Sequence, residues 1–311
     1  MKKIIEDNGV KIFLVKLLIF IVTITVADLI IGTVLKKTYF KQQQGYDYMT
    51  TFSIKKANDP VMIFGSSRAV NIFNPAVMEK ELNLPCFNAG RIGQSIFYHY
   101  AVLKSVLKRY KPEKIILSFD AGNFDKDQED YDRLSSLLPY YESNPEIEPV
   151  INLKGPYEKI KAISTIYPYN SLLLPILNGN LNRNKRSYAN IKGYMPIKKT
   201  TSGPVRTIDY TKEDVLDPEK INTYRAFISE CIKAGIELHI VCPPYLVNAI
   251  GNDLSIETAK KIAAEYKIDF IDYSRDSFYM RQPQLFADFR HLNGKGADLF
   301  SEQVAEIIGN N

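Results

Sequence analysis

Apolar residues along the chain form short continuous runs that alternate with longer segments of helical periodicity. The runs are rich in Val, Ile and Phe and stop at Gly, Pro or Asn, as strands do. Runs without a polar alternation are typical of a parallel sheet that is covered on both faces. The expected strands are 61–64, 85–87, 114–119, 237–242 and 269–272, and the expected helices are 75–82, 95–110, 218–234, 256–266 and 294–308.

Strands that alternate with helices predict an α/β fold. Right-handed crossovers applied to these units give a flavodoxin-like, doubly wound sheet of five parallel strands with the order 2-1-3-4-5. Residues 122–212, after the third strand, interrupt the alternation. We expect this segment to contribute no central strand and to form an inserted lid or acceptor-binding segment at the carboxyl edge of the sheet; a solvated insertion without a role fits the pattern equally well.

The N-terminal region carries the longest apolar stretch, residues 17–35, interrupted by a single Asp. Its length matches the roughly 20 residues that cross a bilayer core, and no small-residue cleavage site follows it. We therefore expect an uncleaved transmembrane helix in the cytoplasmic membrane. Lysines at 2, 3, 11 and 16 favour a cytoplasmic N-terminal tail of residues 1–16. Residues 36–57 are polar and predict a stalk, which leaves an extracytoplasmic domain of residues 58–311.

Asp28 is the ionisable residue inside the apolar stretch. At the centre of a membrane helix such a group costs about 2.5–3.5 kcal/mol, so it usually faces water or a protein partner. Two interpretations follow. Asp28 contacts a polytopic membrane partner, or it lies close enough to the outer interface to be hydrated.

Composition narrows the functional classes. The net charge of +5 is spread over mixed signs, which indicates no nucleic-acid partner. Cysteines 86, 231 and 242 have no metal-ligand spacing and are expected to be buried thiols. The sequence therefore predicts neither a metal site nor a cofactor.

Two motifs carry candidate chemistry. The first strand stops at Gly65-Ser66-Ser67, and the segment after the fifth strand contains Asp288 and His291. Carboxyl ends of parallel strands share one edge of the sheet, so these groups are expected to meet there. Ser67 would be the nucleophile, His291 its base and Asp288 the group that orients the base. Ser66 is the alternative nucleophile.

Other polar residues lie at the same edge. Arg68 fits either the binding of an anionic substrate or a cap on the sheet edge, and Asn88 and Tyr245 are expected to contact substrate. Of the remaining histidines, His239 lies within a strand and His99 within a helix, so both are expected to be structural.

The order and spacing of these motifs resemble the SGNH (GDSL-like) hydrolase superfamily over residues 58–311. Gly65-Ser66-Ser67 is similar to the first block of that family, and Asp288-Phe-Arg-His291 is similar to its last block. The resemblance implies an oxyanion hole built from the backbone of Gly93 and the side chain of Asn123. The third block departs from the family, because Asn123 is shifted relative to the usual Gly-x-Asn-Asp pattern.

With the N-terminal anchor, the sequence also resembles the membrane-anchored branch of this superfamily, which includes D-alanyl-lipoteichoic-acid transfer proteins and polysaccharide O-acetyltransferases. The resemblance implies an esterase or O-acyltransferase that acts on a cell-envelope polysaccharide beside a polytopic membrane-bound O-acyltransferase, which Asp28 would contact. The alternative is a non-catalytic glycan-binding or assembly protein of the same fold. A flavin- or nucleotide-binding protein is disfavoured because it leaves Asp288 and His291 without a role. The acyl group, the acceptor, and hydrolysis or transfer stay open.

Overall fold

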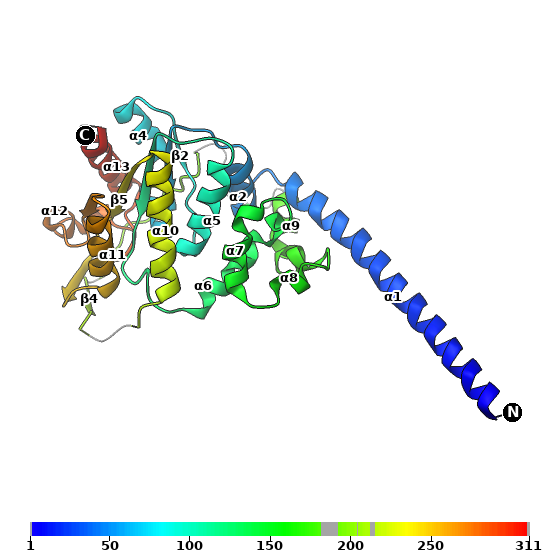
Figure 1. Ribbon diagram of the computed structural model, residues 1–311. Coiled ribbons are helices and arrows are strands. Elements are labelled where there is room, and N and C mark those ends of the chain that lie inside the picture. Colours follow the sequence, from blue (N-terminus) through cyan, green and yellow to red (C-terminus); the bar gives the residue numbers. More distant parts are fainter. Residues whose placement is uncertain (1, 182–191, 204, 212–214, 310–311) are drawn as a thin grey trace.

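A computed structural model describes residues 2–181, 192–203, 205–211 and 215–309 (Figure 1). Its central element is a five-stranded parallel sheet with the order β2-β1-β3-β5-β7. This confirms the predicted α/β fold and strand order. The strands are β1 (Val61–Phe64), β2 (Cys86–Asn88), β3 (Lys114–Ser118), β5 (Glu237–Cys242) and β7 (Phe270–Asp272).

Helices cover both faces of the sheet, and alternate strand residues enter two separate cores. Met62 and Phe64 of β1 enter one core, whereas Val61 and Ile63 enter the other. The first core is completed by α2 (Tyr46–Lys55), α5 (Ile96–Leu107), α10 (Pro218–Ala234) and α11 (Leu254–Glu265). The second is completed by α3 (Ser67–Ile72), α4 (Pro75–Leu82) and α13 (Gly294–Gly309). Because each strand is apolar on both sides, its run shows no polar alternation.

The N-terminal helix α1 (Lys2–Lys41) extends away from the domain (Figure 1). Its part from Asn8 to Lys41 is long and apolar enough to cross a membrane, and its apolar side chains up to residue 34 are mostly exposed. The helix is longer than the predicted 17–35 because polar residues at both ends continue it.

Residues 36–57 are not the predicted stalk. They comprise the end of α1, a short link and helix α2, which packs against α5 with Met49 and Ile54 buried. Asp47 of α2 forms an ion pair of 2.9 Å with Arg91. The sequence pattern did not predict this helix, because its buried face includes Asp47, Thr50 and Ser53 rather than a simple apolar stripe.

The described residues of the insertion after β3 are mostly helical and contribute no strand to the central sheet, as predicted. Its helices include α6 (Gln128–Asp132), α7 (Glu148–Ile151), α8 (Glu158–Lys161) and α9 (Leu173–Asn180), together with 3-10 helices at Arg133–Tyr140 and Tyr167–Leu172. Its one described strand, β4 (Arg206–Asp209), pairs with β6 (Val247–Ile250), which the sequence did not predict. Residues 182–191 of the insertion lie outside the described residues.

Asp28 forms hydrogen bonds to the insertion of the same chain. Its carboxylate accepts from the Ser164 hydroxyl at 2.5 Å and from the Thr165 backbone N–H at 2.7 Å. We expected this side chain to face a polytopic partner or water. The sequence could not reveal the contact because more than a hundred residues separate the two segments.

Candidate active site

The first wall of the site is the turn that follows β1. Gly65 has a φ of +142°, and a Cβ there would lie 2.7 Å from the Ser118 Cβ, so the turn requires glycine. The chain then enters α3 at Ser67, between β1 and its neighbour β3. This is the point where the strand order reverses, and open α/β sheets bind their ligands there.

His291 and Asp288 lie opposite this turn, on the loop between β7 and α13. The Ser67 Oγ is 2.8 Å from His291 Nε2, and His291 Nδ1 is 3.0 Å from Asp288 Oδ1. Asp288 also accepts hydrogen bonds from the backbone N–H groups of Arg290 and His291. The carboxylate therefore fixes both the loop and the imidazole ring. The structure thus brings Ser67, His291 and Asp288 into the predicted arrangement.

Ser66 takes a different role from its neighbour. Its hydroxyl donates to Asp120 Oδ2, at the end of β3, and forms no hydrogen bond with His291 among the described residues. Arg68 is 1% exposed, lies 3.4 Å from Asp120 Oδ1 and donates to the Pro244 carbonyl at 2.7 Å. Its guanidinium carbon lies 3.6 Å from the centre of the Tyr245 ring. Of its two predicted roles, this geometry favours the cap on the sheet edge.

The two predicted oxyanion groups line the same cleft, which has a volume of about 270 Å³. The Gly93 carbonyl accepts from Arg133 Nη1 at 2.6 Å, and its N–H has no acceptor among the described residues. Asn123 lies in the turn after β3 and lines the wall next to Asp120. The first N–H groups of α3 lack an acceptor within that helix, so they add donors beside Ser67.

The electrostatic environment suits a neutral base. Burial lowers the pKa of His291, and the Arg68 guanidinium lowers it further, whereas Asp288 opposes this shift. Burial acts to raise the pKa of Asp288, but hydrogen bonds from the Arg290 N–H and from His291 outweigh it, and the net pKa is lowered. The arrangement at neutral pH is therefore an ionised carboxylate, a neutral imidazole and a serine hydroxyl.

Two predicted substrate contacts lie elsewhere. Asn88 is fully buried, and its amide donates to the carbonyls of Ala69 and Phe73. It holds α3 on the sheet and does not line the cleft, so its predicted substrate contact is wrong. Its place at a strand end gave the same sequence signal as a ligand-binding residue.

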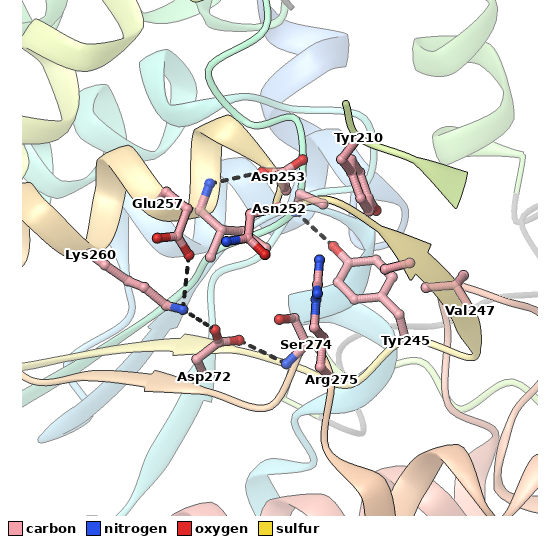
Figure 2. Close-up of a pocket in the computed structure, with 13 residues that line it drawn as sticks. Tyr210, Tyr245, Val247, Asn252, Asp253, Glu257, Lys260, Asp272, Ser274 and Arg275 are labelled. Atoms are coloured by element: carbon pink, nitrogen blue, oxygen red, sulfur yellow. Dashed lines mark hydrogen bonds and ion pairs between the residues drawn. The ribbon is translucent and has the colours of Figure 1, made fainter. Parts of the chain in front are cut away.

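Tyr245 lines a second pocket of about 260 Å³ instead of the Ser67 cleft. Its hydroxyl accepts from the Ala121 N–H at 2.7 Å (Figure 2). In the same pocket Lys260 lies between the carboxylates of Glu257 and Asp272. The two pockets share Ala121 as a wall residue.

The other histidines have no place in the cleft. His239 is buried on β5 and pairs with Glu237 at 2.8 Å. His99 is buried on α5, where neither ring nitrogen has a hydrogen-bond partner among the described residues, and burial lowers its pKa to about 3. Both positions agree with the expected structural roles.

Several cleft residues carried no assigned role in the sequence. Asp120 ends β3, a position that pointed to the edge but not to Ser66 and Arg68 as its partners. Arg133 comes from the insertion and bridges the Gly93 carbonyl to Glu129 at 2.7 Å. No local motif marks Arg133, because its role depends on the tertiary course of the insertion. The cleft is completed by Gln94, Ser95, Asp127, Asp130 and Arg290.

Comparisons with known proteins give distant similarity to solved structures. Neither a protein-family model nor a curated protein sequence matches the chain. Among solved structures, the chain is similar to an acetyl xylan esterase, AlAXEase, with a TM-score of 0.40 and 14% identity. The match covers 80% of this chain and 98% of that one. A likeness this distant carries no argument about substrate or mechanism, which depend on the geometry of the cleft.

Proposed function

We propose that this protein is a membrane-anchored serine esterase or O-acyltransferase whose acyl-enzyme forms on Ser67. The supporting observation is the continuous relay from the Ser67 hydroxyl through His291 to Asp288, at 2.8 and 3.0 Å, in the wall of an open polar cleft. Such a relay is the arrangement that raises the nucleophilicity of serine.

In the proposed mechanism the Ser67 oxygen attacks the carbonyl carbon of an ester while its proton passes to His291 Nε2. The carbonyl oxygen becomes an oxyanion, for which the proposed donors are the N–H groups of Gly93 and Ser67 and the amide of Asn123. The C–O bond to the alcohol breaks, and the alcohol leaves with the proton from His291. Water or a glycan hydroxyl then gives its proton to His291 and attacks the acyl carbon. The bond between the acyl carbon and the Ser67 oxygen breaks, and His291 returns the proton to Ser67.

Cell-envelope polysaccharide is the proposed acceptor or substrate. The basis is the N-terminal helix α1, which suits a protein held at a membrane, and a cleft whose lining is polar rather than apolar. An extracytoplasmic transferase has no acyl-coenzyme pool, so a polytopic O-acyltransferase is the proposed source of the acyl group. Asp28 is not the proposed contact, since its carboxylate is occupied within the chain.

The first test is covalent labelling of the full chain in detergent micelles with a fluorophosphonate, which reacts with activated serines. We expect labelling of the native protein and of Ser66→Ala, and none of Ser67→Ala. Ser66→Ala is the matched control, because it removes a neighbouring hydroxyl that hydrogen-bonds to Asp120 and not to His291. Absence of labelling in a folded native protein would favour the non-catalytic glycan-binding protein.

The second test separates hydrolysis from transfer. Nitrophenyl acetate loads Ser67 with an acetyl group, and an oligosaccharide is then offered in increasing concentration. Acetylated oligosaccharide formed at the expense of free acetate identifies a transferase. Free acetate that does not respond to the oligosaccharide identifies an esterase.

A further inference from the structure

The insertion contains a cluster of exposed apolar side chains beside α1. Among the described residues outside α1, seven of the fourteen large apolar side chains that are strongly exposed lie between residues 157 and 181. Ile163 is 79% exposed and Leu174 is 71% exposed. Scattered single apolar residues are normal on a protein surface, but a concentration in one short segment indicates a binding surface. The cluster comprises Tyr157, Ile160, Ile163, Leu173, Leu174, Leu177 and Leu181.

This segment is an ordered part of the fold. Glu158 is fully buried, lies 2.8 Å from Lys161 Nζ and accepts from the Tyr167 hydroxyl at 2.5 Å. Tyr169 and Ile176 of the same segment enter the first core. The apolar side chains are therefore presented outward by a fixed scaffold.

The segment also packs along α1. Asp28 binds the loop at 164–166. The Asn180 amide donates to the Thr38 carbonyl at 3.0 Å, about three turns further along the helix. Between them, a Cβ on Gly32 would lie 2.2 Å from Thr165 Oγ1, so a side chain there would prevent the close approach. Figure 1 shows α8 and α9 beside the domain-proximal part of α1.

The position of these contacts along α1 determines how deep they would lie in a bilayer. A span of about 20 residues that begins after Lys16 ends near Lys36, which puts Asp28 roughly 10 Å inside its edge at 1.5 Å per residue. A span that begins after Lys11 still includes Asp28. Either placement brings the loop at 164–166 to the level of the bilayer or below its surface.

We propose that residues 157–181 insert their apolar side chains into the leaflet on the domain side of the membrane, with Asp28 holding the loop against α1. The proposal rests on the membrane anchoring included in the proposed function. Helix α9, which carries part of the apolar cluster, contacts α1, whose own apolar side chains are exposed. Exposed Lys159 within the cluster suits lipid phosphate groups. Hydrogen bonds from Ser164 and Thr165 satisfy a carboxylate that hydrocarbon would otherwise leave unpaired.

The absence of tryptophan from the sequence allows a direct test. Single tryptophans are introduced into the full chain as Ile163→Trp, Leu174→Trp, Phe20→Trp and Ile232→Trp, and each variant is reconstituted in phosphatidylcholine vesicles with brominated acyl chains. Bromine quenches tryptophan fluorescence only on contact. We expect strong quenching at 20, 163 and 174, and little at 232, which lies exposed on α10 away from α1.

The outcomes separate the two proposals. Quenching at 20 with values at 163 and 174 equal to that at 232 would overturn the insertion of residues 157–181 while leaving the anchor intact. Absence of quenching at position 20 would contradict the proposal that α1 anchors the protein in the membrane. Neither result depends on fluorophosphonate labelling of Ser67.

Two further experiments test the alternative occupant and the role of Asp28. In native membranes, a photo-crosslinker at position 174 should attach to lipid, and attachment mainly to a protein would assign the surface to a protein partner instead. Asp28→Leu combined with Ile163→Trp should lose at least half of its quenching, whereas Asp28→Leu with Phe20→Trp should keep its quenching. Unchanged quenching at 163 would show that Asp28 does not hold the loop.

Discussion

Two pockets of nearly equal volume, about 270 and 260 Å³, lie at the carboxyl edge of the sheet, and they differ in how their polar groups are paired. In the Ser67 cleft the hydroxyl, imidazole and carboxylate form a directed relay, and the Gly93 N–H has no acceptor among the described residues. In the second pocket Lys260 is neutralised by Glu257 and Asp272 (Figure 2).

The comparison shows that a cavity identifies a reaction only through the state of its side chains. Reaction requires donors and acceptors that are positioned but not saturated, because a saturated ion pair must break before it can act. Arg68 and Tyr245 form the wall between the pockets. We therefore expect chemistry on one side of this wall and a structural or binding role on the other.

The largest expected difference concerns the central residue of each pocket. Ser67→Ala should lower kcat/KM for nitrophenyl acetate by at least about 10³-fold, because the nucleophile is lost. Lys260→Ala should change it by less than about threefold. Steady-state hydrolysis by the full chain in micelles gives both values. Equal losses would show that the second pocket belongs to the reacting site.

The next difference concerns a carboxylate in each pocket. Asp288→Asn should lower kcat by about 10²- to 10⁴-fold, since the imidazole loses the group that sets its tautomer and orientation. Asp272→Asn is the matched change in the second pocket and should leave kcat unchanged. A native kcat for Asp288→Asn would restrict Asp288 to holding its loop.

Substitution of Arg68, in the wall shared by the two pockets, should lower the stability of the fold more than the turnover. Arg68→Met leaves the buried Asp120 carboxylate without its cation, which we expect to cost about 3 kcal/mol of unfolding free energy. Loss of the Lys260–Asp272 pair, which is partly exposed, should cost only about 0.5–1 kcal/mol. Denaturant titration of both variants measures the difference. Similar values for the two would contradict the burial-based distinction.

The smallest effect is a displacement of the pH profile. The pKa of His291 is lowered, so the acid limb of kcat/KM should lie below the ordinary histidine value of about 6.5. The unfolded chain then binds more protons than the folded one, so the contribution of His291 to stability is complete above that value and falls as the pH drops toward the folded-state pKa. An acid limb of kcat/KM with an apparent pKa above 6.5 would contradict the lowering of the His291 pKa by burial.

The sequence predicted those parts of the molecule that depend on local pattern and on topology. The apolar runs gave the strand order, and the rule that parallel strands end at one edge predicted that Ser67 and His291 would meet. The β4–β6 pair was missed because both strands are short and largely exposed, so neither forms an apolar run.

Contacts between residues far apart in the sequence were not predicted. Asn88 and Asp28 each carry a polar group in an apolar setting, which suggests a ligand or a partner protein, yet each satisfies that group within the chain. Arg133 reaches the Gly93 loop only because the insertion folds back over the edge. Sequence reasoning identifies that a buried polar group needs a partner, but it does not identify the partner.

Helix α1 and helix α2 are separated only by residues 42–45, and α2 is fixed to the domain by the ion pair between Asp47 and Arg91. A long flexible tether would allow the domain to occupy many positions and orientations above the membrane. This short connection restricts the domain to positions close to the end of α1. With α1 in a bilayer, encounters with a substrate therefore depend on lateral diffusion of the whole protein and on the polymer approaching one fixed height. The rate should accordingly respond to the surface density of the protein more than to its concentration in the surrounding volume.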